Sequence, residues 1–109
     1  MLLNLLLFLN TSIEILINAS DIRYKKIAIA IANHESGHGK YVKNNNLFGF
    51  KAKSYKKYPS KSHSVADYKR FEDRIIDRYS VKSKEQYLRV LGRIYAKDPN
   101  WSVKIKKMI

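Results

Sequence analysis

The chain has 109 residues, of which 45% are hydrophobic and 12% aromatic, so it is large enough to bury one modest core. Its formal net charge of +13 favours anionic partners: nucleic acid, an anionic membrane or an anionic cell wall. The absence of cysteine excludes disulfides and cysteine-based metal sites. We expect a single domain over residues 1–109.

An apolar run opens the chain and predicts a helix over residues 2–17, interrupted near Asn10–Ser12. Its first nine residues, MLLNLLLFL, are too few to span a bilayer, so we expect no stable membrane insertion. A secretory signal normally carries a positive charge ahead of such a run, but the first basic residue is Arg23. We interpret the run as a buried first helix, with a divergent signal peptide as the alternative.

The next helix is predicted over residues 21–36, with Ser20 or Asp21 as its cap. Within it, residues 27–32 alternate Ile and Ala, a pattern that also suits a strand. Because all six are apolar, periodicity alone does not decide; the helical preference of Ala favours the helix. Gly37 and Gly39 are expected to end it.

A less regular segment follows. Three asparagines at residues 44–46 predict a turn, and residues 47–58 are short, aromatic and extended in character up to Pro59. A further helix is expected to start with a capping-box-like pattern at Ser64. Its inner face should carry Val65, Tyr68, Phe71, Ile75 and Tyr79, which follow helical spacing.

Two more helices complete the predicted order. Ser83 and Gln86 form a second capping box, followed on one face by Leu88, Leu91 and Tyr95. Asp98 and Pro99 are expected to start the last helix, with an inner stripe of Trp101, Ile105 and Met108. The sum is a mainly α domain of about five helices.

Glu35 is the principal candidate for chemistry. It lies at the end of an apolar helix, just before the glycine-rich stretch Ser36–Gly39. Partial desolvation there would raise the carboxyl pKa, so that the group holds a proton near neutral pH. An acid of this kind protonates the leaving oxygen in glycosidic cleavage, and the glycines let a polymer approach the backbone.

Four stretches in order carry a resemblance to a known family: Glu35-Ser36-Gly37, Asn45–Lys51, Ser64–Tyr68 and Tyr95–Trp101. Together they resemble the bacterial and phage endo-β-N-acetylglucosaminidases of glycoside hydrolase family 73. The resemblance implies a small lysozyme-like helical fold with at most a short, reduced β-lobe. It also implies hydrolysis of the β-1,4 bond between N-acetylglucosamine and N-acetylmuramic acid in peptidoglycan, with no cofactor and no nucleic acid as partner.

The resemblance also assigns roles by position. Glu35 matches the general acid, and Tyr95 matches a tyrosine at the catalytic site. Substrate-binding positions are expected at Asn45, Asn46, Phe48, His38 and Trp101, where Trp101 is either a sugar-stacking face or core. Asp67 matches a helix-capping position and is interpreted as structural. The expected place of action is the bacterial cell wall: extracellular, periplasmic or virion-associated.

Two departures from the family pattern affect the mechanism. His38 replaces a tryptophan and removes a stacking surface. Many family members carry a second acidic residue before the next helix, but residues 50–66 here contain no Asp or Glu. Two routes then remain: the acetamido group of the substrate acts as nucleophile, or Glu35 works with a water held by Tyr95 or Asn46. A third outcome is a protein that binds glycan without cleaving it.

Two alternative functions come from other patterns. His34, Glu35 and His38 match H-E-x-x-H, in which two His on one helical face bind zinc, as in metallopeptidases. A third ligand is needed, and nothing in the sequence places His63, Glu72 or Asp73 there. Separately, the basic and aromatic stretch of residues 53–58 is typical of a nucleic-acid-binding surface, although no recognised nucleic-acid motif accompanies it.

Overall fold

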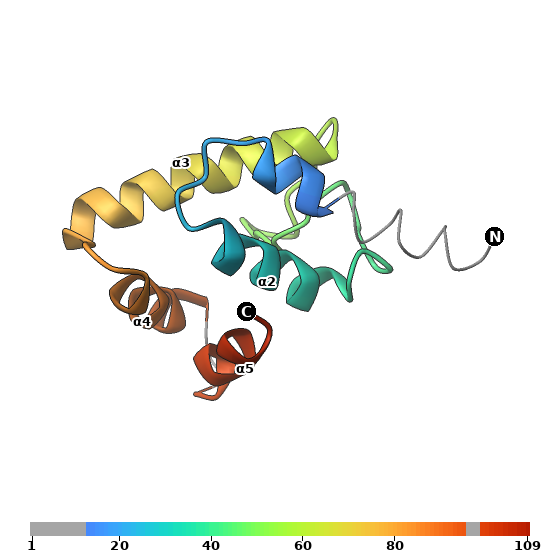
Figure 1. Ribbon diagram of the computed structural model, residues 1–109. Coiled ribbons are helices and arrows are strands. Elements are labelled where there is room, and N and C mark those ends of the chain that lie inside the picture. The colour runs from blue at the N-terminus through green and yellow to red at the C-terminus, as the bar shows by residue number, and fades with distance from the viewer. Residues whose placement is uncertain (1–12, 96–98) are drawn as a thin grey trace.

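The computed structural model describes residues 13–95 and 99–109. After a helical stretch at residues 13–18, four helices follow in order, α2 (Lys25–Ser36), α3 (Lys61–Tyr79), α4 (Lys84–Tyr95) and α5 (Trp101–Lys107). Figure 1 shows α2 at the centre, with α3 above it and α4 and α5 below. The predicted mainly α, lysozyme-like fold is confirmed. Most of the predicted first helix lies outside the described residues.

The β-lobe is reduced to isolated pairings. Within the described residues, the segment between α2 and α3 contains two single antiparallel bridges, Lys43 with Asn46 and Lys51 with Tyr55. The extended character expected for residues 47–58 therefore amounts to irregular chain with one bridge. None of the helices in the described residues is long and apolar enough to cross a membrane.

Helix α2 is surrounded by other elements, which explains its uniformly apolar sequence. Five of the six residues from Ile27 to Ala32 are buried, and only Ile29 is partly exposed. A helix that is buried around most of its circumference needs no polar face. The alternation of Ile and Ala therefore reflects burial of a helix and does not indicate a strand. Around α2 the core is completed by residues of the neighbouring elements, chiefly Ile13, Ile17, Leu47, Phe48, Tyr68, Tyr87, Leu91 and Ile105.

Helix α2 begins at Lys25, four residues later than predicted, and neither Ser20 nor Asp21 caps it. The reason is a tertiary contact. The buried carboxylate of Glu72, on α3, accepts hydrogen bonds from the backbone N–H groups of Arg23 (2.7 Å) and Tyr24 (3.1 Å). These hydrogen bonds hold residues 21–24 in a non-helical conformation ahead of α2. The predicted end is correct, because Gly37 adopts the left-handed conformation after Ser36.

The predicted start of α3 at Ser64 is wrong. The helix begins one turn earlier at Lys61, because Ser60 is its N-cap and accepts a hydrogen bond from the backbone N–H of His63. Ser64 is buried inside the helix, where its hydroxyl donates to the carbonyl of Lys61 and accepts the N–H of Leu47. Two serines four residues apart offered the same capping pattern, and only the packing of the Leu47 loop distinguishes them.

The start of α4 follows the predicted capping box, since Ser83 Oγ accepts the N–H of Gln86. Helix α5 begins at Trp101 rather than at Pro99, with Asn100 as N-cap, and Asp98 lies outside the described residues. The inner stripes are correct except at their ends. Tyr79 and Met108 are exposed, because each lies at the last residue of its helix or just beyond it.

We predict that Glu72→Ala lowers the free energy of unfolding by about 2–4 kcal/mol, because two backbone donors lose their acceptor. Denaturant unfolding followed by circular dichroism measures this change. The control is Asp77→Ala, which removes an exposed carboxylate from the same helix and should change stability by less than about 0.5 kcal/mol. Equal effects of the two substitutions would contradict the structural role of Glu72.

Candidate active site

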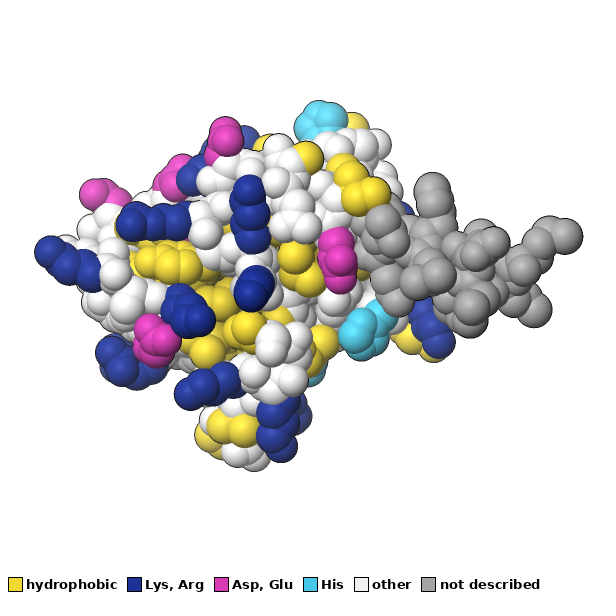
Figure 2. Space-filling model, viewed as in Figure 1, with side chains coloured by type: hydrophobic (Ala, Val, Ile, Leu, Met, Phe, Trp, Pro, Cys, Tyr) yellow, Lys and Arg dark blue, Asp and Glu magenta, His cyan; other side chains and the backbone are white. Residues whose placement is uncertain are grey.

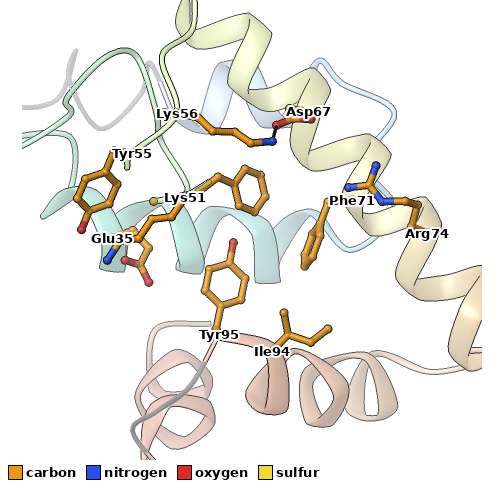
Figure 3. Close-up of a pocket in the computed structure, with 11 residues that line it drawn as sticks. Glu35, Lys51, Tyr55, Lys56, Asp67, Phe71, Arg74, Ile94 and Tyr95 are labelled. Atoms are coloured by element: carbon orange, nitrogen blue, oxygen red, sulfur yellow. Dashed lines mark hydrogen bonds and ion pairs between the residues drawn. The ribbon is translucent and has the colours of Figure 1, made fainter. Parts of the chain in front are cut away.

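Glu35, the penultimate residue of α2, faces a cleft of about 450 Å³. Figure 3 shows its carboxyl beside Tyr95, which comes from the end of α4, while Phe71 and Asp67 approach from α3. A smaller hollow of about 150 Å³ adjoins the cleft, and both are lined by Glu35, Gly49 and Tyr55. The carboxyl therefore lies where the two hollows meet.

Gly49 fixes how closely the loop approaches this carboxyl. Its φ is +68°, a conformation that favours glycine. A Cβ atom at this position would lie 3.0 Å from Oε2 of Glu35 and 3.4 Å from its Cδ. Any larger residue would therefore be strained and would also displace the acid. Gly49 was not singled out in the sequence, although it falls within the Asn45–Lys51 stretch.

The environment of Glu35 favours its protonated form. Partial burial in the cleft raises its pKa above the ordinary value, and the positive charges of His34 and Lys51 and the indole N–H of Trp101 oppose this rise without cancelling it. The side chain retains enough exposed surface to reach a ligand. Its place at the C-terminal, negative end of α2 also disfavours the carboxylate. This agrees with the direction expected from the sequence.

Tyr95 and Trp101 form a stacked pair behind the carboxyl. Their ring centroids are 5.0 Å apart with planes 6° from parallel. The Tyr95 hydroxyl donates to the carbonyl of Phe48 at 3.4 Å, and burial beside Glu35 raises the pKa of Tyr95 well above its ordinary value. Trp101 is buried, and its N–H makes no hydrogen bond within the described residues. Trp101 is therefore core rather than a sugar-stacking face, and its N–H acts on Glu35 only at longer range.

The Asn45–Phe48 stretch mainly builds the loop; of the residues predicted to bind substrate there, Asn46 lines the smaller hollow at Glu35, and neither Asn45 nor Phe48 lines either hollow. The Asn46 amide donates to the carbonyls of Phe50 (2.8 Å) and Lys56 (3.3 Å), and its oxygen accepts the N–H of Phe50. Asn45 donates to the carbonyl of Tyr58, and Phe48 is fully buried against Tyr68 with ring centroids 4.3 Å apart. These contacts favour a positioning role for Asn45 and Phe48, which were expected to bind substrate directly, whereas Asn46 both holds the loop and lines the smaller hollow.

His38 is not brought to the cleft. It follows the left-handed Gly37, has a φ of +59°, and lines neither hollow at Glu35. Because α2 ends at Ser36, His34 and His38 do not share a helical face, which removes the geometry that H-E-x-x-H requires. Within the described residues no cluster of three potential metal-binding side chains occurs. The zinc interpretation therefore has no structural support.

Asp67 is a second carboxylate in the cleft, one residue beyond the acid-free segment of residues 50–66. It lies inside α3 and does not cap it. Its oxygens accept hydrogen bonds from Tyr58 (2.5 Å), Lys56 (3.3 Å) and Arg70 (3.4 Å). Partial burial raises the pKa of Asp67, but these donors and the positive charges outweigh that effect, and the pKa lies below the ordinary value.

Comparison with known proteins agrees with this arrangement. The sequence profile of the glucosaminidase family, described as mannosyl-glycoprotein endo-beta-N-acetylglucosaminidase, matches residues 11–109, about nine-tenths of the chain. The chain belongs to the glucosaminidase family. This confirms the resemblance and makes the protein a glycosidase-type hydrolase, with peptidoglycan as the substrate class that the family implies. A search of curated proteins found no match.

Several residues of this glucosaminidase cleft were not identified from sequence. Asp67 was interpreted as a cap. Lys51 belongs to the Asn45–Lys51 stretch, and Tyr55 and Lys56 to the basic aromatic stretch of residues 53–58, but none of the three was assigned to the site. The remaining cleft residues carried no motif that separates them from ordinary helix positions: Phe71, Arg74 and Ile94. The available signal was the Ser64–Tyr68 stretch of the family pattern, which contains Asp67. The place of Asp67 in the cleft was missed because the helix was assumed to start at Ser64.

We predict that Lys51→Met raises the pKa of Glu35, because it removes a positive charge that favours the carboxylate. The carboxyl carbon of Glu35 can be titrated by NMR in both proteins. Lys53→Met removes an equal charge from the same loop at a position outside the cleft, and it should leave the titration unchanged. An unchanged pKa of Glu35 in Lys51→Met would show that Lys51 does not act on the acid.

Proposed function

We propose that this glucosaminidase hydrolyses the β-1,4 bond between N-acetylglucosamine and N-acetylmuramic acid in peptidoglycan, with Glu35 as general acid. The observation that carries the proposal is the position of the Glu35 carboxyl. It lies between two adjoining hollows, beside Gly49, with a raised pKa. A sugar in each hollow would place the bridging oxygen at this carboxyl, which can donate a proton to it.

The two carboxylates of the cleft suit different tasks. The pKa of Glu35 is raised and that of Asp67 is lowered, so near neutral pH Glu35 retains its proton more readily while Asp67 is ionised. Opposite shifts of this kind distinguish an acid from a charged partner. We propose that the Asp67 carboxylate stabilises positive charge on the sugar or orients the acetamido group that attacks it. This arrangement favours the substrate-assisted route, in which the acetamido group displaces the leaving sugar as Glu35 protonates its oxygen, and water then hydrolyses the intermediate. The route with a water held by Tyr95 or Asn46 is less favoured, because the Tyr95 hydroxyl and the Asn46 amide already donate to loop carbonyls.

The overall charge supports an anionic polymer as substrate. Peptidoglycan carries carboxylates, and the net charge of +13 would concentrate the enzyme on it. We propose the bacterial cell wall as its place of action and a single domain over residues 1–109. The basic residues 53–58 contribute Tyr55 and Lys56 to the cleft, so they are accounted for without a nucleic-acid partner.

We predict that Glu35→Gln reduces the clearing of purified peptidoglycan by about 10²- to 10⁴-fold, because the proton donor is lost. Turbidity and zymogram assays measure the change, and Glu85→Gln, an exposed matched substitution, should retain full activity. A chelator should have no effect on the wild type. Full clearing by Glu35→Gln would eliminate Glu35 as the acid.

The same variant separates chemistry from folding. Since the folded-state pKa of Glu35 is raised, the stability linked to it is complete at low pH and declines as pH rises through that pKa. Gln cannot ionise, so the variant should unfold at the same temperature as the wild type, or higher, at neutral pH. The activity of the wild type should fall as pH rises through the same pKa.

We predict that Asp67→Asn lowers kcat on the order of 100-fold while KM changes little, because a charge that acts in the transition state is lost. The matched variant is Tyr58→Phe, which removes the hydrogen bond to Asp67 but leaves the carboxylate. If Asp67 only held the loop in place, the two variants would lose activity equally. A much larger loss in Asp67→Asn identifies the carboxylate itself as the contributing group.

A further inference from the structure

A second hollow of about 390 Å³ lies away from the cleft, between the N-terminal ends of α2 and α4 and the C-terminal end of the chain. None of the residues that line it also lines the cleft. On the face shown in Figure 2, apolar side chains gather between α2 and α4, and Lys and Arg side chains surround them. The proposed glycosidase activity does not use this surface.

The rim of the hollow is strongly basic. It contains five cations against one acid, Glu85, and the cations are Arg23, Lys25, Lys26, Lys84 and Lys106. None of the four ion pairs found between described residues includes any of these five cations; Lys25 donates a hydrogen bond to the neutral carbonyl of Asn18 (3.0 Å) and Arg23 lies over the ring of Tyr24, so no carboxylate pairs with either. Like charges gathered around one hollow repel each other, and an anionic occupant would relieve that repulsion.

The floor of the hollow is apolar, which narrows the choice of occupant. It is formed by Tyr24, Ile27, Leu88 and Ile109, and Ile109 remains 50% exposed. The neighbouring Met108 is 36% exposed. A sugar–phosphate polymer or a nucleic acid would satisfy the cations but would leave this floor in contact with water or polar groups. An anionic phospholipid offers a phosphate for the rim and acyl carbon for the floor.

We propose that this hollow binds anionic phospholipid at a membrane surface. Binding of this kind is peripheral and requires no membrane-spanning helix. The hollow lies at the N-terminal ends of α2 and α4, whereas Glu35 and Tyr95 lie at their C-terminal ends. From the helical rise, Lys25 and Glu35 on α2, and Lys84 and Tyr95 on α4, are separated by about 15–17 Å along these helices. An enzyme held in this way would direct its cleft away from the bilayer.

The test is sedimentation with vesicles of phosphatidylglycerol and phosphatidylcholine, compared with vesicles of phosphatidylcholine alone. We expect binding only to the anionic vesicles, with a steep decrease as salt rises. The double variant Lys26→Gln/Lys84→Gln should weaken binding on the order of 10- to 30-fold. Its matched control, Lys53→Gln/Lys57→Gln, removes the same charge outside the hollow and should weaken binding by less than about threefold.

A third variant tests the apolar floor. Ile109→Ser leaves every charge in place and changes a side chain that is half exposed and outside the buried core, and it should weaken vesicle binding about fivefold. Equal losses in the two lysine variants, or no binding to anionic vesicles, would overturn the proposal. It would also be overturned if poly(glycerol phosphate) competed fully and Ile109→Ser had no effect, because the occupant would then be a polyanion without acyl chains. None of these measurements depends on peptidoglycan cleavage.

Discussion

The structure depends on the contact between the last turn of α2 and the loop at Gly49. An acid at the C-terminal end of a buried helix is unfavourable when charged, and Gly49 lets the loop come close to its carboxyl. The raised pKa of Glu35 follows chiefly from partial burial in the cleft, while enough of the side chain stays exposed to reach a ligand. The surrounding loop therefore has to be built rigidly, and Asn46 does so with three hydrogen bonds to Phe50 and Lys56.

The rest of the cleft follows from how α3 meets that loop. Tyr58 and Lys56, from the loop, donate to Asp67 on α3, so the same hydrogen bonds that fasten the loop also keep the second carboxylate ionised. Behind Glu35, the stacked Tyr95 and Trp101 link the end of α4 to the start of α5. Three segments that are distant in sequence thus meet at one carboxyl, and their packing sets its protonation.

Helices α2 and α4 each present one end to the cleft and the other to the basic hollow. Most of α2 is buried and apolar, so its charged residues are confined to its ends: Lys25 and Lys26 at the start, His34 and Glu35 at the finish. This distribution places the positive charges that attract anions at one end of α2 and the carboxyl of Glu35, whose pKa is raised, at the other. The basic residues therefore do not all have the same surroundings. Only those around the basic hollow lie next to an apolar floor.

The amino-acid sequence by itself determined the helical class, the end of α2 at Gly37, the capping box of α4 and the position of Glu35, the proposed acid, in the last turn of α2. These depend on local propensity and on residues adjacent in the chain. Tertiary structure alone decided that Glu72 delays the start of α2, that Ser60 rather than Ser64 caps α3, and that Asp67 reaches the cleft. These features depend on which hydrogen-bonding groups from distant parts of the chain come close once the core has packed. The spacing of residues along the chain does not specify those partners.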